Sequence, residues 1–399
     1  MKTLLYQLAS PGADRVFQIN LGTRASDWIV PFTKALKKVL FLSSLLGTVS
    51  AGLAQSTSTL KTDGKLPKNT VTATVNVGGY LPSLAVSPDS STLYVANEEA
   101  GTVIVIDATN NYAIKATTTV GSEPEYLAVS PDGKKLYVSN YTQQGTVSVV
   151  DTTQTNYPVV ATLNTGAYPA ALAITPDGTE LWVANYGSTY NQIPGTISVF
   201  ETATDNLKST IATNGSPWLI AFAKKGKQAD VLNYVGGGLI QFINTVSEKV
   251  SPSVGAAGQL IYPDGMTIDA SGSTLYIADA VNYVSVCDAI HGAQTAQLSA
   301  VSSVYASYEL GQPAVTKNGK YLYVPYYYDS ATDTAANQVV MVDVSTGKIV
   351  GAPITVDYYP YWTQIAPDGQ TLYVVSEQYG AGSVTVINIT PQGARKSLT

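Results

Sequence analysis

Acidic and aromatic side chains recur together where apolar stretches of this chain end, and they are its main candidates for chemistry. Rigid aromatic faces beside carboxylates suit a sugar ring, a cationic small molecule or a peptide segment. A carboxylate in such a place can also act as a general base. The candidate binding residues are Glu98, Glu125, Tyr126, Tyr141, Tyr186, Trp218, Tyr234, Asp264, Tyr326, Tyr361, Trp362 and Glu377. The competing interpretation is that these aromatic side chains only fill space between structural elements.

Other kinds of site find little support among the residues present. His291 is the only histidine and Cys287 the only cysteine, whereas copper and catalytic zinc sites usually use several such side chains. Cys287 lies in an alternating strand pattern, so we expect a small core residue rather than a reactive thiol. The sequence also has no CxxCH segment for covalent haem. It therefore predicts no catalytic residues, no metal ligands and no cofactor, with only an oxygen-ligated Ca²⁺ or Mg²⁺ left open.

The distribution of charge excludes some partners. Residues 71–388 contain 25 Asp plus Glu residues against 11 Lys and no Arg, a net charge of about −14. Without Arg this span has no bidentate donor for phosphate, and its negative charge repels polyanions. Nucleic acid and phosphorylated sugars are therefore disfavoured as ligands.

The elements that must position the candidate residues form an internal repeat. Its clearest mark is a Leu-aromatic pair followed by small and β-branched residues, and successive copies start 43 to 50 residues apart. A period of this size indicates a circular or stacked array of small structural units. The seven copies are LYVAN at 93–97, LYVSN at 136–140, LWVAN at 181–185, ADVLN at 229–233, LYIAD at 275–279, LYVPY at 322–326 and LYVVS at 372–376.

Each repeat predicts four short strands. A short apolar run precedes the Leu-aromatic segment, and an alternating run such as TVSVVD at 146–151 follows it, with Pro-Asp-Gly or Asn/Gly clusters between them. A fourth strand follows in six of the repeats but not in the last. The strand VTATVNV at 71–77 precedes the first repeat and can complete the last one, which closes the ring. The sequence therefore predicts an all-β, seven-bladed β-propeller with four-stranded antiparallel blades.

Two recurring polar positions are interpreted as turn residues rather than ligands. An Asn or Asp ends the Leu-aromatic segment in five repeats, and we expect it to hold the next corner by bonding its own backbone two residues on. These residues are Asn97, Asn140, Asn185, Asn233 and Asp279. The carboxylates of the Pro-Asp-Gly turns are expected to serve the hairpins, and they are Asp132, Asp177 and Asp368.

The segments YVAN (94–97), YVSN (137–140) and WVAN (182–185) resemble the motif of the YVTN-repeat propellers. The resemblance covers residues 71–388 and is weaker in the fourth to sixth repeats, where Ala229-Asp230 replaces one Leu-aromatic pair. It implies an extracytoplasmic propeller. YVTN blades are also similar to those of lactonase-like propellers, which implies an alternative activity on a non-phosphorylated sugar lactone or cyclic ester.

The N-terminal region predicts export. Residues 34–54 have a basic start, a short apolar stretch and small residues suited to cleavage after Ala51 or Ala54, as in a secretory signal peptide. We expect a periplasmic, secreted or cell-surface protein without a membrane span after cleavage, although a retained anchor is the alternative. The remaining predicted parts are an unassigned extension at 1–33, whose start is suspected to lie too far upstream, a polar linker at 55–70, the propeller at 71–388 and a tail at 389–399.

Three functions are compatible with these features. The favoured one is a monomeric binding or scaffold module. It would bind a glycan, a peptide, a cationic small molecule or an envelope protein at the mouth of the propeller, which the aromatic and acidic candidate residues named above are expected to form. The alternatives are the lactonase-like hydrolase and a structural surface-layer component. Specificity is expected in the two longest insertions, 185–196 and 326–338, because extended loops on a rigid scaffold often carry recognition.

Overall fold

A computed structural model describes most of the repeat region and two short segments before it. The described residues are 4–5, 18–19, 66–188, 191–234, 239–252, 254–255, 263–279, 283–299, 308–329, 337–377 and 380–390. Apart from β1 and β2, residues 1–65 lie outside them, and so do the predicted signal peptide and most of the linker. Among the described residues, none belongs to a helix with the length and hydrophobicity needed to span a bilayer.

Contacts divide the chain into two compact units. One comprises residues 1–59 and 188–193, in which β1 (Leu4–Leu5) pairs antiparallel with β2 (Gln18–Ile19). The other comprises residues 60–187 and 194–399 and contains the repeats. All further description concerns this second unit.

Seven antiparallel sheets make up the repeat unit. The first three are β4 (Leu84–Val86), β5 (Thr92–Asn97), β6 (Thr102–Asp107) and β7 (Ala113–Thr119); β8 (Pro124–Val129), β9 (Lys135–Asn140), β10 (Thr146–Asp151) and β11 (Val159–Asn164); and β12 (Pro169–Ile174), β13 (Glu180–Asn185), β14 (Thr196–Glu201) and β15 (Leu207–Ala212).

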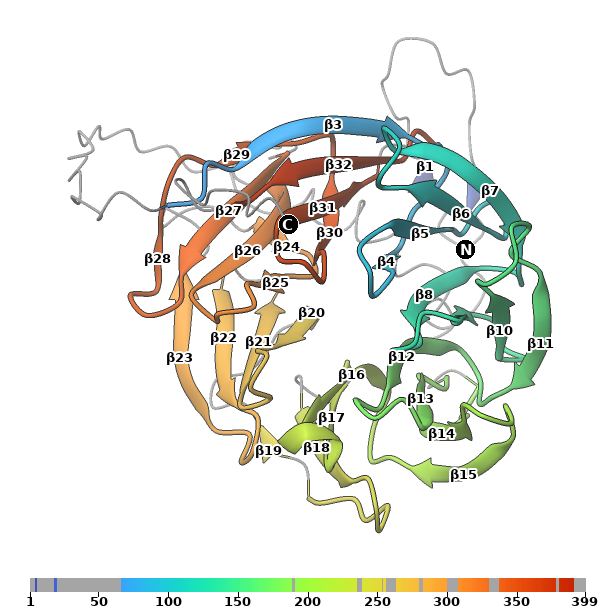
Figure 1. Cartoon of the computed structure of the whole chain (residues 1–399). Helices are drawn as coiled ribbons and strands as arrows, with labels where there is room; N and C mark the ends of the chain where they lie inside the picture. The colour runs from blue at the N-terminus through green and yellow to red at the C-terminus, as the bar shows by residue number, and fades with distance from the viewer. Residues whose placement is uncertain are drawn as a thin grey trace. The chain divides into compact units, whose positions relative to one another are not determined.

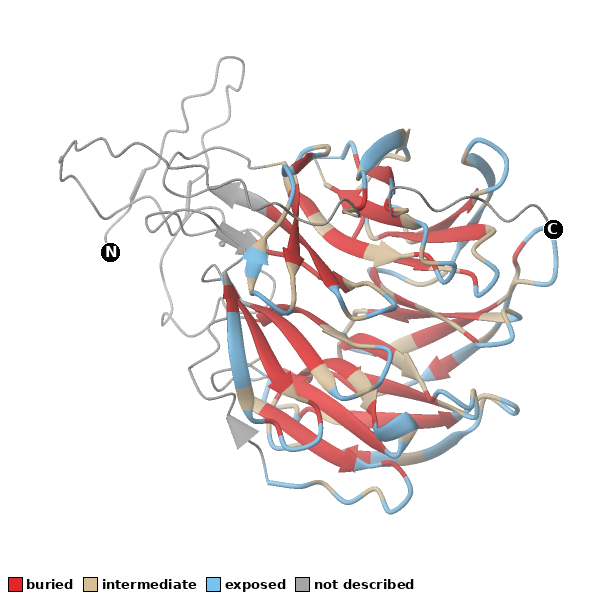
Figure 2. Ribbon diagram, turned by 60° about the vertical axis from the view of Figure 1, so that its left-hand side comes forward, coloured by how far each residue is buried: buried red, intermediate tan, exposed pale blue. Residues whose placement is uncertain are grey.

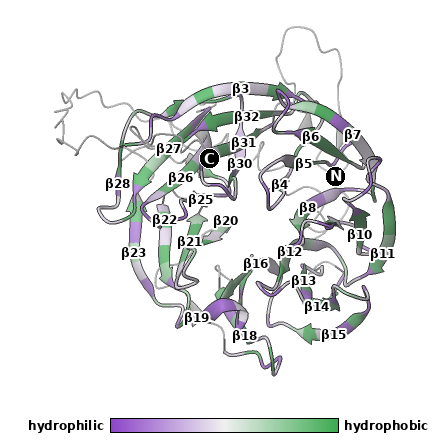
Figure 3. Ribbon diagram, in the orientation of Figure 1, coloured by the Kyte–Doolittle hydropathy of each residue, from purple (hydrophilic) through white to green (hydrophobic). Residues whose placement is uncertain are grey.

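The fourth and fifth sheets follow the same order. They are β16 (Pro217–Ala223), β17 (Gln228–Asn233), β18 (Leu239–Asn244) and β19 (Val254–Gly255), with the short 3-10 helix η1 (Lys224–Gly226) between the first two, and β20 (Pro263–Ile268), β21 (Thr274–Asp279), β22 (Tyr283–Asp288) and β23 (Gln294–Ser299). Figure 3 shows hydrophobic stretches along these strands and the hydrophilic η1 between them.

The sixth sheet is more irregular than the repeat predicts. It contains β24 (Tyr308–Leu310), β25 (Ala314–Val315), β26 (Tyr321–Asp329), β27 (Gln338–Asp343), β28 (Lys348–Ile349) and β29 (Ile354–Thr355). The fourth strand expected for this repeat, at residues 348–356, does pair with β27, but it is interrupted and forms two short pieces, β28 and β29. Gly351 adopts a positive φ of 76°, and Pro353 lacks a backbone N–H, so the outer strand breaks into β28 and β29.

The last sheet joins both ends of the repeat region. It has the order β3-β32-β31-β30, formed by β3 (Thr70–Asn76), β30 (Pro360–Ile365), β31 (Thr371–Ser376) and β32 (Ser383–Asn388). The predicted closing strand is confirmed: Val75 pairs with Val384 and Ala73 with Val386. Figure 1 shows the seven sheets as blades around a central axis, with β4, β8, β12, β16, β20, β25 and β30 innermost. The chain is a seven-bladed β-propeller.

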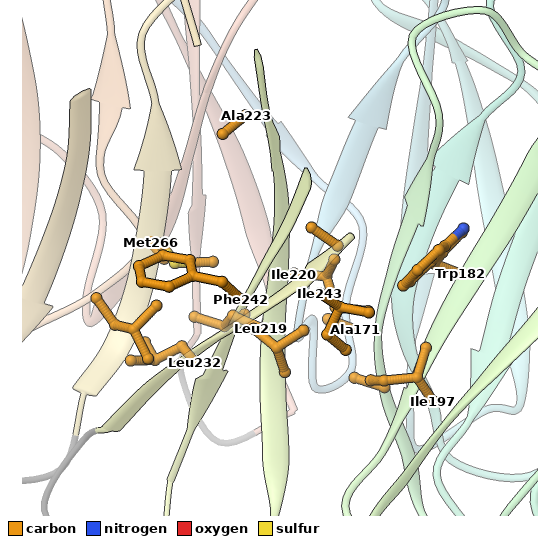
Figure 4. Packing of buried hydrophobic residues seen from close by; sticks show 14 of the residues in the cluster. Ala171, Trp182, Ile197, Leu219, Ile220, Ala223, Leu232, Phe242, Ile243 and Met266 are labelled. Atoms are coloured by element: carbon orange, nitrogen blue, oxygen red, sulfur yellow. The ribbon is translucent and has the colours of Figure 1, made fainter. Parts of the chain in front are cut away.

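The hydrophobic core lies between neighbouring blades. The two middle strands of the first blade, β5 and β6, are almost fully buried, whereas the outer strands β7, β11 and β15 are mostly exposed. Figure 2 shows buried strands, in red, beside exposed ones in pale blue. In Figure 4, Trp182 and Ile197 of the third blade and Leu219 and Ile220 of the fourth belong to one such cluster. Cys287 is a free, buried member of the same cluster, and burial raises the pKa of its thiol to about 11, which confirms the predicted core role.

Candidate functional site

The candidate site begins at the first residues of the innermost strands. In five blades this strand starts with a proline, at Pro124, Pro169, Pro217, Pro263 and Pro360. Proline suits that position because it cannot donate to the ladder. In each of these five strands the pairing register shifts directly after the proline. Such bulges re-aim side chains at the rims of sheets.

Side chains at the bulge converge on one small cavity. In the five blades whose innermost strand starts with proline, the residue after that proline lines the cavity, and Pro82 lies at the equivalent position of the first blade. These six lining residues are Pro82, Glu125, Ala170, Trp218, Asp264 and Tyr361. Tyr126, Leu219 and Trp362, each one residue further along its strand, complete the lining. The cavity has a volume of about 20 Å³, which is room for one group of about the size of a water molecule.

Two carboxylates dominate the electrostatics of the cavity. Glu125 on β8 is 8% exposed and Asp264 on β20 is 5% exposed. Figure 1 places β8 and β20 across the central axis from each other. None of the nine lining residues is basic. Burial raises the pKa of the neighbouring Tyr126 phenol to about 12, so this ring stays neutral at physiological pH.

Tyr126 and Trp362 line both the small cavity and a wider one. Their ring centroids lie 5.0 Å apart in an edge-to-face contact, and both residues line a second cavity of about 440 Å³. That second cavity extends to the hairpin prolines Pro88, Pro131 and Pro367 and is lined mainly by apolar side chains. The buried indole N–H of Trp362 has no hydrogen-bond partner among the described residues.

Beside the cavity lies a cluster of five aromatic rings, here called the aromatic rim. Trp218 belongs to both, because its ring lies 5.6 Å from that of Tyr234, 5.9 Å from that of Tyr186 and 6.1 Å from that of Tyr141. Tyr168 completes the rim, 5.4 Å from Tyr141. Burial also raises the pKa of Tyr186. The five rings thus form one set of mutual contacts that reaches the cavity through Trp218.

A repeated backbone contact holds the rim residues. The residue after the second strand of a blade donates its backbone N–H to the loop before the first strand: Tyr141 to the carbonyl of Glu123 at 2.8 Å, and Tyr186 to that of Tyr168 at 2.9 Å. Glu123, Tyr168 and the equivalent Tyr359 all have positive φ, between 52° and 55°. Residues other than glycine rarely adopt a positive φ, so the hydrogen bond holds the backbone of these loops in a strained conformation.

The other predicted site residues lie elsewhere. Glu98 and Glu377 occupy the same post-strand position in the first and last blades, with backbone N–H bonds to Tyr80 and Tyr359, and they do not line the cavity. Tyr326 is buried in the core between blades, and its hydroxyl bonds Gln338. The insertions at 185–196 and 326–338 fall partly outside the described residues.

The Asn series holds the blade corners, as predicted, but its members do so through different bonds. Asn97 accepts from the backbone N–H of Ala100, three residues on, at 3.1 Å. Asn140 donates from Nδ2 to the hydroxyls of Thr146 and Ser148 at 2.9 and 3.1 Å, and its Oδ1 accepts from the Gly121 N–H at 3.1 Å. Asn185 likewise donates to Thr196 and Ser198. The predicted bond to the backbone two residues on is therefore wrong for these residues. The carboxamide instead bonds the third strand of the same blade, and that of Asn140 also bonds the loop before the first strand.

The hairpin carboxylates behave as predicted. Asp132 accepts from Ser130 Oγ and Asp177 from Thr175 Oγ1, both at 2.6 Å, and these bonds lower the pKa of each carboxyl. Asp368 accepts the backbone N–H of Gln370 at 2.8 Å. His291 lies in an exposed turn with Nδ1 2.7 Å from Asp288 Oδ2. The described residues contain no cluster of three or more His, Cys, Asp or Glu side chains suited to a metal.

The chain is similar to known seven-bladed propellers in part of its sequence and to one solved structure in its fold. The family model described as "Lactonase, 7-bladed beta-propeller" matches residues 105–217, less than a third of the chain. Among solved structures, hydrazine synthase of Kuenenia stuttgartiensis is similar with a TM-score of 0.65 and 22% identity, covering 84% of this chain and 99% of that one. This likeness concerns the fold. No curated protein matches the sequence.

Proposed function

We propose that this protein is an extracytoplasmic binding module whose ligand lies on the aromatic rim and places one small group in the central cavity. The observation that carries the proposal is the convergence of six candidate residues from four blades on one cavity. These residues are Glu125, Tyr126, Trp218, Asp264, Tyr361 and Trp362. Buried acidic groups beside aromatic walls in a concave space are typical of ligand sites. Export rests on the signal-like segment at 34–54.

A thermal-shift screen of the purified protein tests this function. The panel contains neutral and acidic sugars, sugar lactones and amines, because a ligand that binds the native state raises its melting temperature. We expect a shift with at least one compound that disappears in Trp218→Ala and Glu125→Gln. The control is Glu201→Gln, which changes an exposed carboxylate outside the cavity. A ligand shift that survives both cavity substitutions would place the binding site elsewhere.

A lactonase-like hydrolase is the second candidate, favoured by the partial match to the lactonase family model. Glu125 or Asp264 would then act as a general base toward water near the ester carbonyl. The span 71–388 lacks Arg, so a non-phosphorylated lactone is the suitable substrate. Product formation by titration of released acid, lost in Glu125→Gln or Asp264→Asn but kept in Glu201→Gln, would select this activity over binding alone.

A further inference from the structure

One donor in the lining of the central cavity lacks an acceptor. Trp362 lines this cavity and is only 6% exposed, and its indole N–H has no hydrogen-bond partner among the described residues. The edge-to-face contact with Tyr126 holds the indole ring in place. A buried donor without an acceptor is unfavourable, and native proteins leave few of them. A ligand group that accepts a hydrogen bond would satisfy this donor.

The charge of the lining favours an uncharged acceptor. None of the nine lining residues is basic, and two of them, Glu125 and Asp264, are acidic. A carboxylate or phosphate oxygen would therefore be buried without a counter-charge, which is costly. The net charge of about −14 over residues 71–388 adds to the repulsion of anions. The acceptor that suits this cavity is a neutral oxygen.

The size of the cavity requires a group at the end of a short arm. The volume of about 20 Å³ admits one group of about the size of a water molecule. A peptide carbonyl is bonded to the chain on both sides, so it could not enter without its neighbours. A primary hydroxyl group is attached through a single carbon, and its oxygen accepts from an N–H. The geometry therefore favours a primary hydroxyl group over a peptide carbonyl.

The aromatic rim provides the surface for the rest of such a ligand. Trp218 lines the cavity and also contacts the rings of Tyr141, Tyr186 and Tyr234. These four side chains are half-buried, so part of each ring remains open to solvent. Rigid aromatic surfaces of this kind pack on the apolar C–H face of a sugar ring. A pyranose ring on Trp218 would bring its exocyclic hydroxymethyl group beside the cavity.

Building on the proposed binding function, we infer that the ligand is a neutral glycan that contains a hexopyranose. The sugar ring lies on the rim at Trp218, and its 6-hydroxyl group occupies the cavity and accepts from the indole N–H of Trp362. The site then distinguishes a hexose from a 6-deoxyhexose, which lacks the acceptor. It also distinguishes a hexose from a uronic acid, which has a larger and negatively charged group at the same carbon.

Calorimetric titration with matched sugars tests this inference. The probes are the methyl glycosides of glucose, galactose and mannose, together with the 6-deoxy form and the uronic acid of each. We expect at least one hexoside to bind. Its 6-deoxy form should bind about tenfold more weakly, because the Trp362 donor then stays unsatisfied. Its uronic acid should bind more weakly than the hexoside as well, because it would bury a charge.

A variant of the donor connects this preference to Trp362. Trp362→Phe removes the indole N–H and keeps an aromatic ring, so it should weaken the hexoside about tenfold and leave the affinity of the 6-deoxy form unchanged. Trp218→Ala should weaken both forms alike, because both lie on the rim. Glu201→Gln, an exposed carboxylate outside the cavity, is the control and should change neither affinity.

The outcomes separate the ligand class from the function. Equal affinities of a hexoside and its 6-deoxy form, or an equal loss of both in Trp362→Phe, would overturn the inference. Trp218-dependent binding of a compound that is not a sugar, with no hexoside bound, would overturn the sugar assignment and leave the binding function intact. A panel without any ligand would count against the binding function itself. If circular dichroism shows that Trp362→Phe is not folded, the comparison of the hexoside with its 6-deoxy form on the wild-type protein decides.

Discussion

At the scale of single residues, Asp230 is the clearest departure from the repeat. Other blades place an aromatic ring at this position, and Tyr137, for example, donates its hydroxyl to Asp205 of the next blade at 3.2 Å. Asp230 is fully buried, and its Oδ1 accepts from Gln228 Nε2 at 2.6 Å while Oδ2 has no partner among the described residues. Burial raises its pKa to about 7, against the hydrogen bond from Gln228 and the charge of Lys224.

This raised pKa predicts a pH-dependent stability. Asp230 ionises near pH 4 in the unfolded chain but only near 7 in the folded one, so the folded state is penalised increasingly as pH rises from about 4 to 7. Below that window there is no penalty. Asp230→Asn should therefore gain on the order of 4 kcal/mol over wild type at pH 8 and little at pH 4, as measured by urea unfolding.

Asp177→Asn is the control for this measurement. The pKa of Asp177 is lowered by hydrogen bonds from Thr175 and Thr179, so its stabilising effect is present at neutral pH and lost as pH falls through the acidic range. The control should thus lose stability at pH 8 and approach wild type at low pH. Identical pH profiles for Asp230→Asn and wild type would show that Asp230 is not held neutral by burial.

At the scale of elements, the contact between the Asn side chains and the preceding glycines fixes the corner in the first four blades. A Cβ at Gly121 would overlap the carboxamide of Asn140, and one at Gly166 would lie 2.8 Å from Asn185 Cγ. Glycine is required there by close approach, because the loop backbone packs directly on the Asn side chain. The same Asn side chains hold the third strand through hydroxyl groups.

A double-mutant cycle on Gly121 and Asn140 tests this packing. Gly121→Ala should destabilise the wild-type protein by about 1–3 kcal/mol through overpacking. In an Asn140→Ala background the clash is absent, so the same substitution should cost less than about 1 kcal/mol. Chemical denaturation of the four proteins measures the coupling. Additive effects would mean that the two residues do not constrain each other.

At the scale of the whole propeller, ring closure depends on one strand from the start of the repeat region. β3 pairs with β32 over six positions, with a register shift between Val71 and Ala73, and covers an edge that would otherwise be open. Ala73 and Val75 turn toward the core cluster of the first and last blades, while Thr74 is exposed.

Two adjacent substitutions on β3 test the closure. Val75→Asp places a charge against the apolar cluster and should lower the free energy of unfolding by about 1–3 kcal/mol. Thr74→Asp adds the same charge one residue away on the solvent face and should stay within about 0.5 kcal/mol of wild type. Equal effects of the two substitutions in equilibrium unfolding would contradict the packing of β3 on the core.

The strands, the seven repeats and the closure by residues 71–77 could be predicted from the sequence, because alternating β-patterns, turn residues and repeat spacing are local properties. It also named Glu125, Trp218, Asp264, Tyr361 and their neighbours as candidates. In the sixth blade the local pattern failed, since it did not show that Gly351 and Pro353 would break the outer strand.

Which of the candidate residues share a site depends on the three-dimensional arrangement of the blades. The sequence analysis grouped five residues, Glu98, Glu125, Asp264, Tyr326 and Glu377, among the candidates. Of these five, Glu125 and Asp264 line the cavity, whereas Tyr326 is buried in the core. The reason is geometric. A bulge after each strand-opening proline turns one side chain toward the axis, and the ring brings together positions from blades that are distant in the chain.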